Sequence, residues 1–236
     1  MDNIILQHFD GDLPDWAKVA KKTVERYALE IGVDYEHVVG MPCGKEQGPY
    51  TQKMHMLNEK YDDYDQVLML DMDVAATKTY ENIFDIPQIG VLHDRAMKSA
   101  SNVKNRWENN KLYKQGHHVF FGSVIKLTKD MRKELRKFIN WSYFNECINY
   151  NYGSDELVLH YLFWNTGLLK DKSYYEICMR RDGVNLSDIH VRNYDRFDRK
   201  FANQPEDSEK NASLIHFCAH RKNFLIPYMK KIHENI

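Results

Sequence analysis

The stretch YDQVLMLDMDVAAT (residues 64–77) places an unbroken apolar run directly before two carboxylates, Asp71 and Asp73. A short run that is apolar at every position is typical of a central parallel strand, buried on both faces. Alternate residues of a strand share one face, so we expect both aspartates to point the same way and Met72 to point into the core. Open parallel sheets bind ligands at the carboxyl ends of their strands. The stretch therefore predicts a functional site where this strand ends.

The segments around this strand alternate between strand-like and helix-like patterns. Residues 4–9 (IILQHF) predict a buried strand, and residues 13–31 place apolar side chains at helical spacing. The other predicted strands are residues 36–40, 66–70, 88–93, 118–125 and 213–219, and the other predicted helices are residues 51–61, 128–141, 154–165 and 228–234. This alternation predicts an α/β fold with a mostly parallel central sheet flanked by helices. We expect a single domain over residues 1–236 because no repeat or linker interrupts the pattern.

The composition favours small-molecule chemistry. The 33 lysines and arginines nearly balance the 34 aspartates and glutamates, so the whole chain lacks a basic footprint for nucleic acid or an anionic membrane. No apolar stretch approaches the length of a membrane span, and the opening MDNIILQHFDGD does not resemble a secretory signal. The four cysteines have no CxxC or metal-type spacing. We expect a cytoplasmic protein with reduced cysteines, no nucleic-acid partner and no transmembrane segment.

Two like charges held close together must share either a proton or a cation. At neutral pH a divalent metal is the usual solution, and oxygen ligands suit Mg²⁺ or Mn²⁺. The Asp-x-Asp pattern is weak by itself, because it occurs at residues 10–12, 63–65 and 71–73 and a solvated turn with capping aspartates is its ordinary explanation. Only the third occurrence ends a predicted buried strand. Its position makes it the candidate metal site.

The sequence YDDYDQVLMLDMDV resembles the donor-site segment of retaining GT-A-fold glycosyltransferases, especially glycosyltransferase family 8. GSDELVLH and HFCAHRK resemble two later motifs of the family and occur in the family's order. The chain departs from the family where Glu156 replaces a glutamine, Ala219 a glycine and Asn223 a proline, and where FFGSVI lacks the usual asparagine. The resemblance implies a Rossmann-like GT-A fold. It also implies a metal-dependent, retaining transferase that moves a sugar from a UDP- or GDP-sugar donor to a glycan or other acceptor hydroxyl.

The resemblance also implies roles for individual residues. These are Mn²⁺ or Mg²⁺ ligation by Asp71, Asp73 and His216, donor contacts by Lys53 and Lys222, a contact of Asp155 with the donor sugar's hydroxyls, and a position of Glu156 near the reacting carbon. Residue chemistry agrees with these roles, because glycosyl transfer requires the leaving diphosphate to be neutralised and a divalent ion plus lysine supplies that charge.

Each of these residues also has an ordinary structural explanation. Asp155 and Glu156 fit the acidic first turn of a helix. His216 fits a buried core position, and Lys222 fits an ordinary surface position. For Glu156 two catalytic roles remain open: nucleophile in a covalent glycosyl-enzyme, or a neighbouring group in same-face attack assisted by the leaving phosphate.

Nucleotide recognition is expected after the first strand. There His8 or Phe9 can stack on a base, and Asp10 can accept a hydrogen bond from it. The polar segment of residues 94–118 is predicted to be a flap that orders over the bound donor. Its region also contains the candidate acceptor contacts Trp107, His117 and His118.

Two other functions fit part of the sequence. The run VLMLDMDVAAT partly matches the nucleophile motif of haloacid-dehalogenase-type phosphohydrolases, in which the first aspartate attacks phosphate. That motif normally opens the chain, and here some seventy residues precede it. A non-catalytic module that binds nucleotide sugars would keep the sheet but need no complete metal set. The presence of Asp71, Asp73 and His216 favours the glycosyltransferase.

Overall fold

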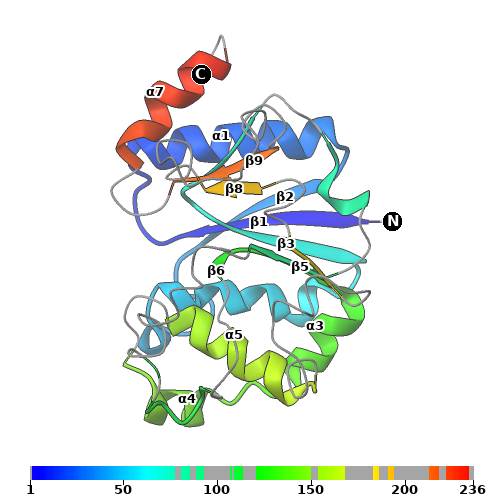
Figure 1. Cartoon of the computed structure of the whole chain (residues 1–236), viewed down its shortest axis with the longest axis vertical. Helices are drawn as coiled ribbons and strands as arrows, with labels where there is room; N and C mark the ends of the chain where they lie inside the picture. The colour runs from blue at the N-terminus through cyan, green and yellow to red at the C-terminus, as the bar shows by residue number, and fades with distance from the viewer. Residues whose placement is uncertain are drawn as a thin grey trace, which may run out of the picture.

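The computed structural model describes the chain as an α/β fold with a central sheet between layers of helices (Figure 1). The described residues are 2–77, 81–85, 89–92, 107, 109–113, 121–149, 154–167, 183–185, 191–193, 213–217 and 222–233.

The central sheet has the strand order β2-β1-β3-β6-β5-β7. Its strands are β1 (Asn3–Phe9), β2 (Asp34–Val39), β3 (Gln66–Asp71), β5 (Ile89–Leu92), β6 (Phe121–Thr128) and β7 (Gly183–Asn185). β1 pairs in parallel with β2 and β3, and β5 pairs in parallel with β7, whereas β6 runs antiparallel to both of its neighbours. The prediction of a mostly parallel central sheet flanked by helices is therefore confirmed.

A small second sheet lies above the first, next to α1 (Figure 1). It has the order β4-β9-β8 and consists of β4 (Val74–Ala76), β8 (Val191–Asn193) and β9 (Leu214–His216). β4 follows β3 after two residues, so the chain passes from the central sheet directly into the small one. The sequence pattern predicted a strand at residues 66–70 but none at β4.

Helices cover both faces of the central sheet. The helix α1 (Asp15–Glu30) lies on one face, and its neighbour α7 (Lys222–Ile232) extends beyond it. The opposite face is covered by α3 (Lys129–Arg136), α4 (Trp141–Cys147), α5 (Ser154–Asn165) and the 3₁₀ helix η2 (Tyr50–Leu57). Shorter 3₁₀ turns are η1 (Lys45–Gln47), η3 (Glu59–Tyr61) and η4 (Ile83–Asp85).

Three helix predictions were wrong in detail. The closing helix predicted near residues 228–234 begins earlier, at Lys222, as α7. Residues 51–61 form the 3₁₀ elements η2 and η3 and not one α-helix. The helix predicted over residues 128–141 ends at Arg136, and a new helix begins after Asn140, whose side chain accepts a hydrogen bond from the backbone of Tyr143. Asparagine at this position is a strong helix-start signal, since its side chain satisfies an otherwise free N–H group.

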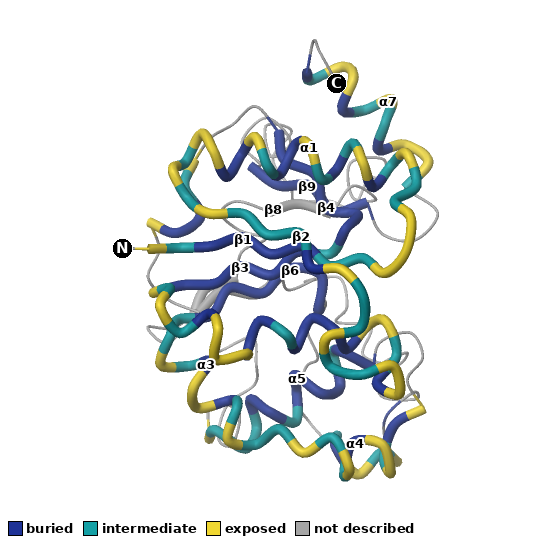
Figure 2. Tube along the Cα trace, turned by 180° about the vertical axis from the view of Figure 1, so that it is seen from behind, coloured by how far each residue is buried: buried dark blue, intermediate teal, exposed yellow. Residues whose placement is uncertain are grey.

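The core is divided by the central sheet. In Figure 2, β1, β3 and β6 are mostly buried, while α1 alternates between buried and exposed residues. Side chains of η2, α3, α4 and α5 fill one face, and side chains of α1 fill the other. A third cluster joins α1 to β9 and α7. Within the described part of the chain, no helix has the length and apolar character needed to cross a membrane.

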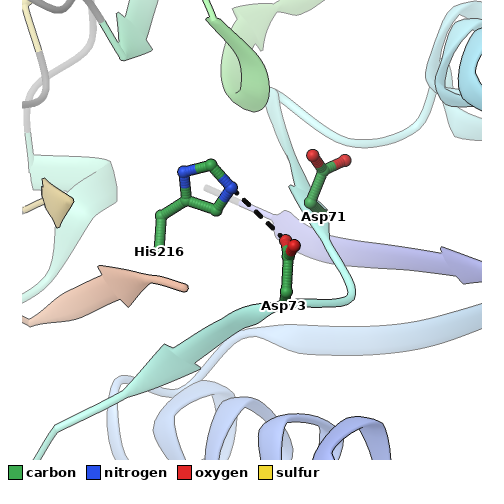
Figure 3. Close-up of side chains that lie close together, drawn as sticks. All are labelled: Asp71, Asp73 and His216. Carbon is green, nitrogen blue, oxygen red and sulfur yellow. Dashed lines mark ion pairs between the residues drawn. The ribbon is translucent and has the colours of Figure 1, made fainter. Parts of the chain in front are cut away.

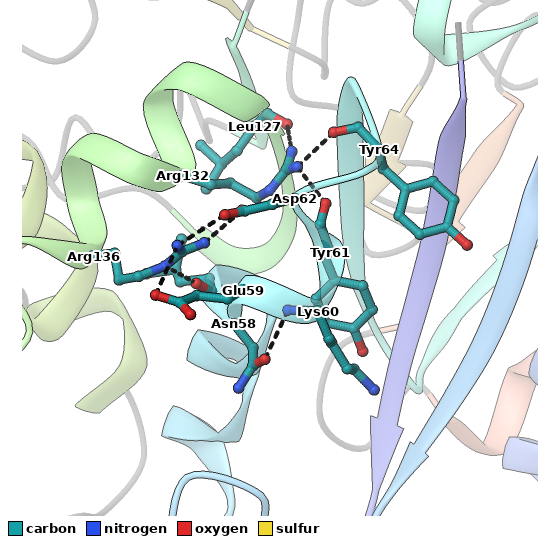
Figure 4. Close-up of polar contacts among 10 residues, drawn as sticks. Asn58, Glu59, Lys60, Tyr61, Asp62, Tyr64, Leu127, Arg132 and Arg136 are labelled. Atoms are coloured by element: carbon teal, nitrogen blue, oxygen red, sulfur yellow. Dashed lines mark hydrogen bonds and ion pairs between the residues drawn. The ribbon is translucent and has the colours of Figure 1, made fainter.

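A buried arginine in α3 holds the segment that precedes β3. The guanidinium of Arg132 donates to the backbone carbonyls of Leu127 at 3.1 Å, Tyr61 at 2.8 Å and Tyr64 at 2.6 Å (Figure 4). Burial lowers the pKa of Arg132 to about 10, which still leaves it charged at neutral pH. One turn later, Arg136 binds both carboxylate oxygens of Asp62, at 3.0 and 2.6 Å.

Replacing Arg132 tests this clamp. In Arg132→Met, three backbone carbonyls lose a donor, so we expect the free energy of unfolding to fall by about 3 kcal/mol in urea denaturation. The matched control is Lys137→Met, because Lys137 pairs with Glu134 on an exposed surface and should change stability by less than about 0.5 kcal/mol. A loss below about 1 kcal/mol in Arg132→Met would contradict the clamp.

Candidate active site

The two aspartates lie at the connection between the two sheets. β3 ends at Asp71, and β4 begins at Val74. The fully buried Gln7 donates from Nε2 to the backbone carbonyls of Asp71 and Val74, each at 3.2 Å. The backbone N–H of Phe217 donates to the carbonyl of Asp73 at 2.9 Å. Hydrogen bonds to the backbone therefore fix this connection on both sides.

The expectation that Asp71 and Asp73 belong to one strand was wrong. Met72 and Asp73 form a turn, and Met72 is buried and lines a cavity. Both carboxylates nevertheless reach the same place, because the turn folds Asp73 back beside the strand end (Figure 3).

His216 completes a cluster with the two aspartates (Figure 3). One potential ligand atom from each residue lies within 4.8 Å of the others. The antiparallel pairing of β4 with β9 sets Val74 opposite His216, and Nε2 of His216 lies 3.4 Å from Oδ1 of Asp73. That oxygen is buried, and no hydrogen bond of good geometry from the described residues reaches it. Two carboxylates and an imidazole around one buried place fit a divalent cation.

The two carboxylates differ in their electrostatic surroundings. Burial raises the pKa of Asp71, and Lys53 only partly opposes this effect. Burial would also raise the pKa of Asp73, but His216 and Lys222 outweigh it and hold that pKa below its usual value. Asp73 is therefore the more firmly ionised member of the pair.

Lys53 joins Asp71 to Asp155. Its ammonium lies 2.7 Å from Oδ1 of Asp71 and forms an ion pair and a hydrogen bond with Oδ2 of Asp155. Lys53 comes from η2 and Asp155 from the first turn of α5, and both side chains are buried. Burial would lower the pKa of Lys53, but the two carboxylates outweigh it and raise that pKa. A charged lysine is thus held at the base of the site.

Gly122 in β6 allows this pair to approach the sheet. A Cβ atom placed on Gly122 would overlap Oδ2 of Asp155 and would lie 3.3 Å from Nζ of Lys53. The absence of a side chain therefore determines where the Asp155 carboxylate can lie. In the sequence, the segment FFGSVI differs from the family pattern by its missing asparagine. The close approach of Asp155 and Lys53 to Gly122 depends on the fold and has no signal in the sequence.

Glu156 lies beside Asp155, is half-buried and lines the cavity described below. Burial, reinforced by the negative charge of Asp155, raises the pKa of Glu156 to about 8. At neutral pH its carboxyl group is therefore mostly protonated. A protonated carboxyl offers one O–H donor and one carbonyl acceptor, which resembles the hydrogen-bonding pattern of a glutamine amide.

Lys222, the first residue of α7, reaches the cluster from the other side. Its ammonium lies 3.2 Å from Oδ2 of Asp73 and 4.7 Å from the ring centroid of Trp16.

The predicted nucleotide-binding residues lie at the end of β1. Nε2 of His8 lies 2.6 Å from the carbonyl of Gly40, so the ring is tied to the loop after β2. Desolvation lowers the pKa of His8. Phe9 packs edge-to-face on Trp16, with ring centroids 6.1 Å apart, and Asp10 is exposed.

A cavity of about 720 Å³ joins all these residues. Its lining includes all ten residues that the sequence analysis assigned to the metal, the donor and catalysis: His8, Phe9, Asp10, Lys53, Asp71, Asp73, Asp155, Glu156, His216 and Lys222. Eight further residues line it: Trp16, Met41, Pro49, Tyr50, Leu70, Met72, Gly122 and Ser123. Most of these eight come from loops or strand ends whose apolar or small residues give no functional signal in a single sequence.

Some predictions fall outside the described residues. His117, His118 and most of the proposed flap at residues 94–118 are among them. Within that segment, Trp107 is 6% exposed and Leu112 is fully buried, and both belong to the core beneath α5. Trp107 is therefore a packing residue in this structure.

The sequence matches no protein-family model, and the search of curated proteins finds no relative. Several solved structures are similar in fold. A glycosyltransferase involved in the glycosylation of the major capsid of PBCV-1 has a TM-score of 0.59 at 15% identity, with 98% of this chain and 100% of that chain covered. The galactosyltransferase LgtC, in complex with donor and acceptor sugar analogues, has a TM-score of 0.51 at 13% identity, with 98% of each chain covered.

An active-site glutamine-to-glutamate mutant of LgtC has a TM-score of 0.51 at 14% identity, again with 98% of each chain covered. These likenesses extend over nearly the whole chain, including the strands and helices that form the cavity. The chain therefore has the GT-A fold of these glycosyltransferases and, at the level of the fold, resembles glycosyltransferase family 8.

Proposed function

We propose that this protein transfers a sugar from a nucleoside-diphosphate sugar to an acceptor hydroxyl, with Mn²⁺ or Mg²⁺ as its cofactor. The observation that supports this most directly is the convergence of Asp71, Asp73 and His216 in one cavity of a GT-A fold. Asp71 and Asp73 come from the connection of β3 to β4 and His216 from the end of β9, and Oδ1 of Asp73 is buried without a hydrogen bond of good geometry.

The chain's own cations and anions fit the parts of such a donor. Lys222 stands at the rim of the metal cluster, where it can neutralise a diphosphate as the leaving group gains charge. Asp155 can accept hydrogen bonds from sugar hydroxyls, and Lys53 holds its carboxylate in place. When bound, the metal would supply further charge neutralisation to the leaving diphosphate.

The size and lining of the cavity also suit a nucleotide sugar. Phe9, Trp16 and Tyr50 add aromatic surface to a lining that also contains the charged groups. Every nucleobase has a flat face that can stack on an aromatic ring. The rings alone therefore do not select between UDP- and GDP-sugars. The acceptor is a glycan or another hydroxyl compound, and the cytoplasmic location remains a prediction from the sequence.

For the stereochemical course, we infer retention by same-face attack assisted by the leaving phosphate. A protonated carboxyl is a poor nucleophile, and Glu156 is held in its neutral form at pH 7. In this role Glu156 acts much as glutamine does, through its carbonyl dipole near the reacting carbon. Asp155 supplies the negative charge that stabilises an oxocarbenium-like centre.

The first prediction of this proposal concerns a metal bridge, in which the diphosphate binds to the protein through the metal ion. In that case binding of UDP or GDP depends on Mn²⁺. In Asp73→Asn, we expect Mn²⁺ affinity to fall by about a hundredfold, because the best ionised ligand is lost. Isothermal titration with and without EDTA measures both effects. Thermal unfolding checks that the fold is intact.

A second Asp-x-Asp pair provides the control. Asp63 is exposed and lies outside the cavity, so Asp63→Asn should bind Mn²⁺ and nucleotide as the wild type does. Equal nucleotide affinity with and without EDTA would refute the metal bridge. Phosphatase activity on simple phosphomonoesters, abolished in Asp71→Asn, would instead support the dehalogenase-type hydrolase.

The neutral state of Glu156 predicts a pH dependence. Because its pKa is raised to about 8, the protonated form predominates below that value, and wild-type turnover should fall as pH rises through about 8. Glu156→Gln cannot ionise, so it should lose this alkaline decline and keep turnover within about threefold at pH 7. The rate of nucleoside-diphosphate release from an accepted sugar donor measures both.

The alternative for Glu156 gives the opposite result. If its carboxylate were the nucleophile, Glu156→Gln would still bind donor and metal but lose turnover by orders of magnitude. A glycosyl adduct on the wild type, detected by intact mass and absent from the mutant, would confirm that outcome. Same-face transfer would then be rejected.

A further inference from the structure

Trp16 occupies an unusual position for a large aromatic residue in the first turn of a helix. One side of it packs against the cluster that joins α1, β9 and α7. Another part of the side chain lines the cavity, and the residue is only half-buried. An aromatic residue needed only for packing would place most of its ring in the core. Trp16 instead keeps part of its surface at the active site.

The Trp16 ring also lies next to a cation. Nζ of Lys222 lies 4.7 Å from the ring centroid, within the range of a cation–π interaction. The same ammonium lies 3.2 Å from Oδ2 of Asp73. Lys222 is 34% exposed and sits at the first residue of its helix, so these two contacts restrain a long side chain that could otherwise extend into water.

The two contacts differ in what happens when a metal ion is present. Asp73 is a candidate metal ligand, and a divalent ion would compete with Lys222 for the charge of its carboxylate. The ring of Trp16 binds no metal and keeps its attraction for the ammonium. Trp16 is therefore the contact that can hold Lys222 at the cavity in the metal-loaded protein.

We propose that Trp16 is a positioning residue that holds the Lys222 ammonium in place to receive the diphosphate of the donor. The inference rests on the proposed function, and it adds a residue whose apolar position in the helix pattern of residues 13–31 indicates packing only. Trp16 also contacts a second lining residue, because Phe9 packs edge-to-face on the same ring. Trp16 thus touches both the predicted base contact and the predicted diphosphate contact.

The experiment uses inorganic pyrophosphate with Mn²⁺, a probe that needs neither base nor sugar. We expect Trp16→Leu to weaken pyrophosphate binding by about tenfold in isothermal titration, and Trp16→Phe to recover most of the loss because it restores an aromatic face. Mn²⁺ binding measured alone should stay unchanged in both variants. A general distortion of the site would weaken both binding reactions together.

A double-mutant cycle shows whether Trp16 acts through Lys222. In a Lys222→Met background, Trp16→Leu should cause no further loss of pyrophosphate affinity, since there is no ammonium left to position. Lys60→Met is the matched control, because it removes a lysine that lies 4.6 Å from the ring of Tyr61, outside the cavity. This control should bind pyrophosphate as the wild type does.

The possible outcomes separate this inference from the proposed function. Normal pyrophosphate binding by Trp16→Leu, or equal losses from Trp16→Leu with and without Lys222, overturns the positioning role. A wild type that fails to bind pyrophosphate with Mn²⁺ overturns it as well. Pyrophosphate binding that follows the expected pattern, in a protein that turns over no nucleotide sugar, would support the inference and reject glycosyl transfer.

Discussion

The active site depends on one buried amide, the side chain of Gln7. Its Nε2 donates to the carbonyls of Asp71 and Val74, one at the end of β3 and one at the start of β4. Its Oε1 accepts from the hydroxyl of Tyr35, so the amide itself cannot rotate without losing a third bond. A buried amide left without partners would cost free energy, and this network therefore determines where the chain leaves the central sheet. The Met72–Asp73 turn follows from that exit.

Once the exit is fixed, residues far apart in sequence meet at the turn. β4 can pair with β9, which brings His216 beside Asp73. The same edge of the central sheet receives Lys53 from η2 and Asp155 from α5. The face of the sheet that carries η2 and α5 also carries α3, which is held by buried polar contacts of Arg132. The result is a preorganised set of charges, which is the property that electrostatic catalysis requires.

Much of this site could be predicted from the sequence, because its charged residues stand next to strong patterns. Asp71 follows a fully apolar strand, and Asp155 and Glu156 open a long apolar helix. The features that were not predicted correctly from the sequence depend on contacts with distant parts of the chain. Residues 50–57 have helical spacing but form 3₁₀ turns, and β4 has only three residues, too few for a periodic signal. Trp16 has the apolar spacing of a packing residue in its helix, and nothing near it in the sequence indicates that Lys222 would lie over its ring.

Two departures from the family 8 pattern lie close together in the structure: Glu156 and the segment FFGSVI. Gly122 lies in the segment that lacks the family's asparagine, and its missing side chain lets Asp155 and Lys53 pack against β6. Burial and the charge of the neighbouring Asp155 raise the pKa of Glu156, whereas a hydrogen bond from the backbone of Gly122 opposes this rise. A glutamate that is neutral at pH 7 can replace a glutamine with little change in hydrogen bonding. The missing side chain of Gly122 makes room for the Asp155 carboxylate, and that carboxylate in turn favours the neutral form of Glu156.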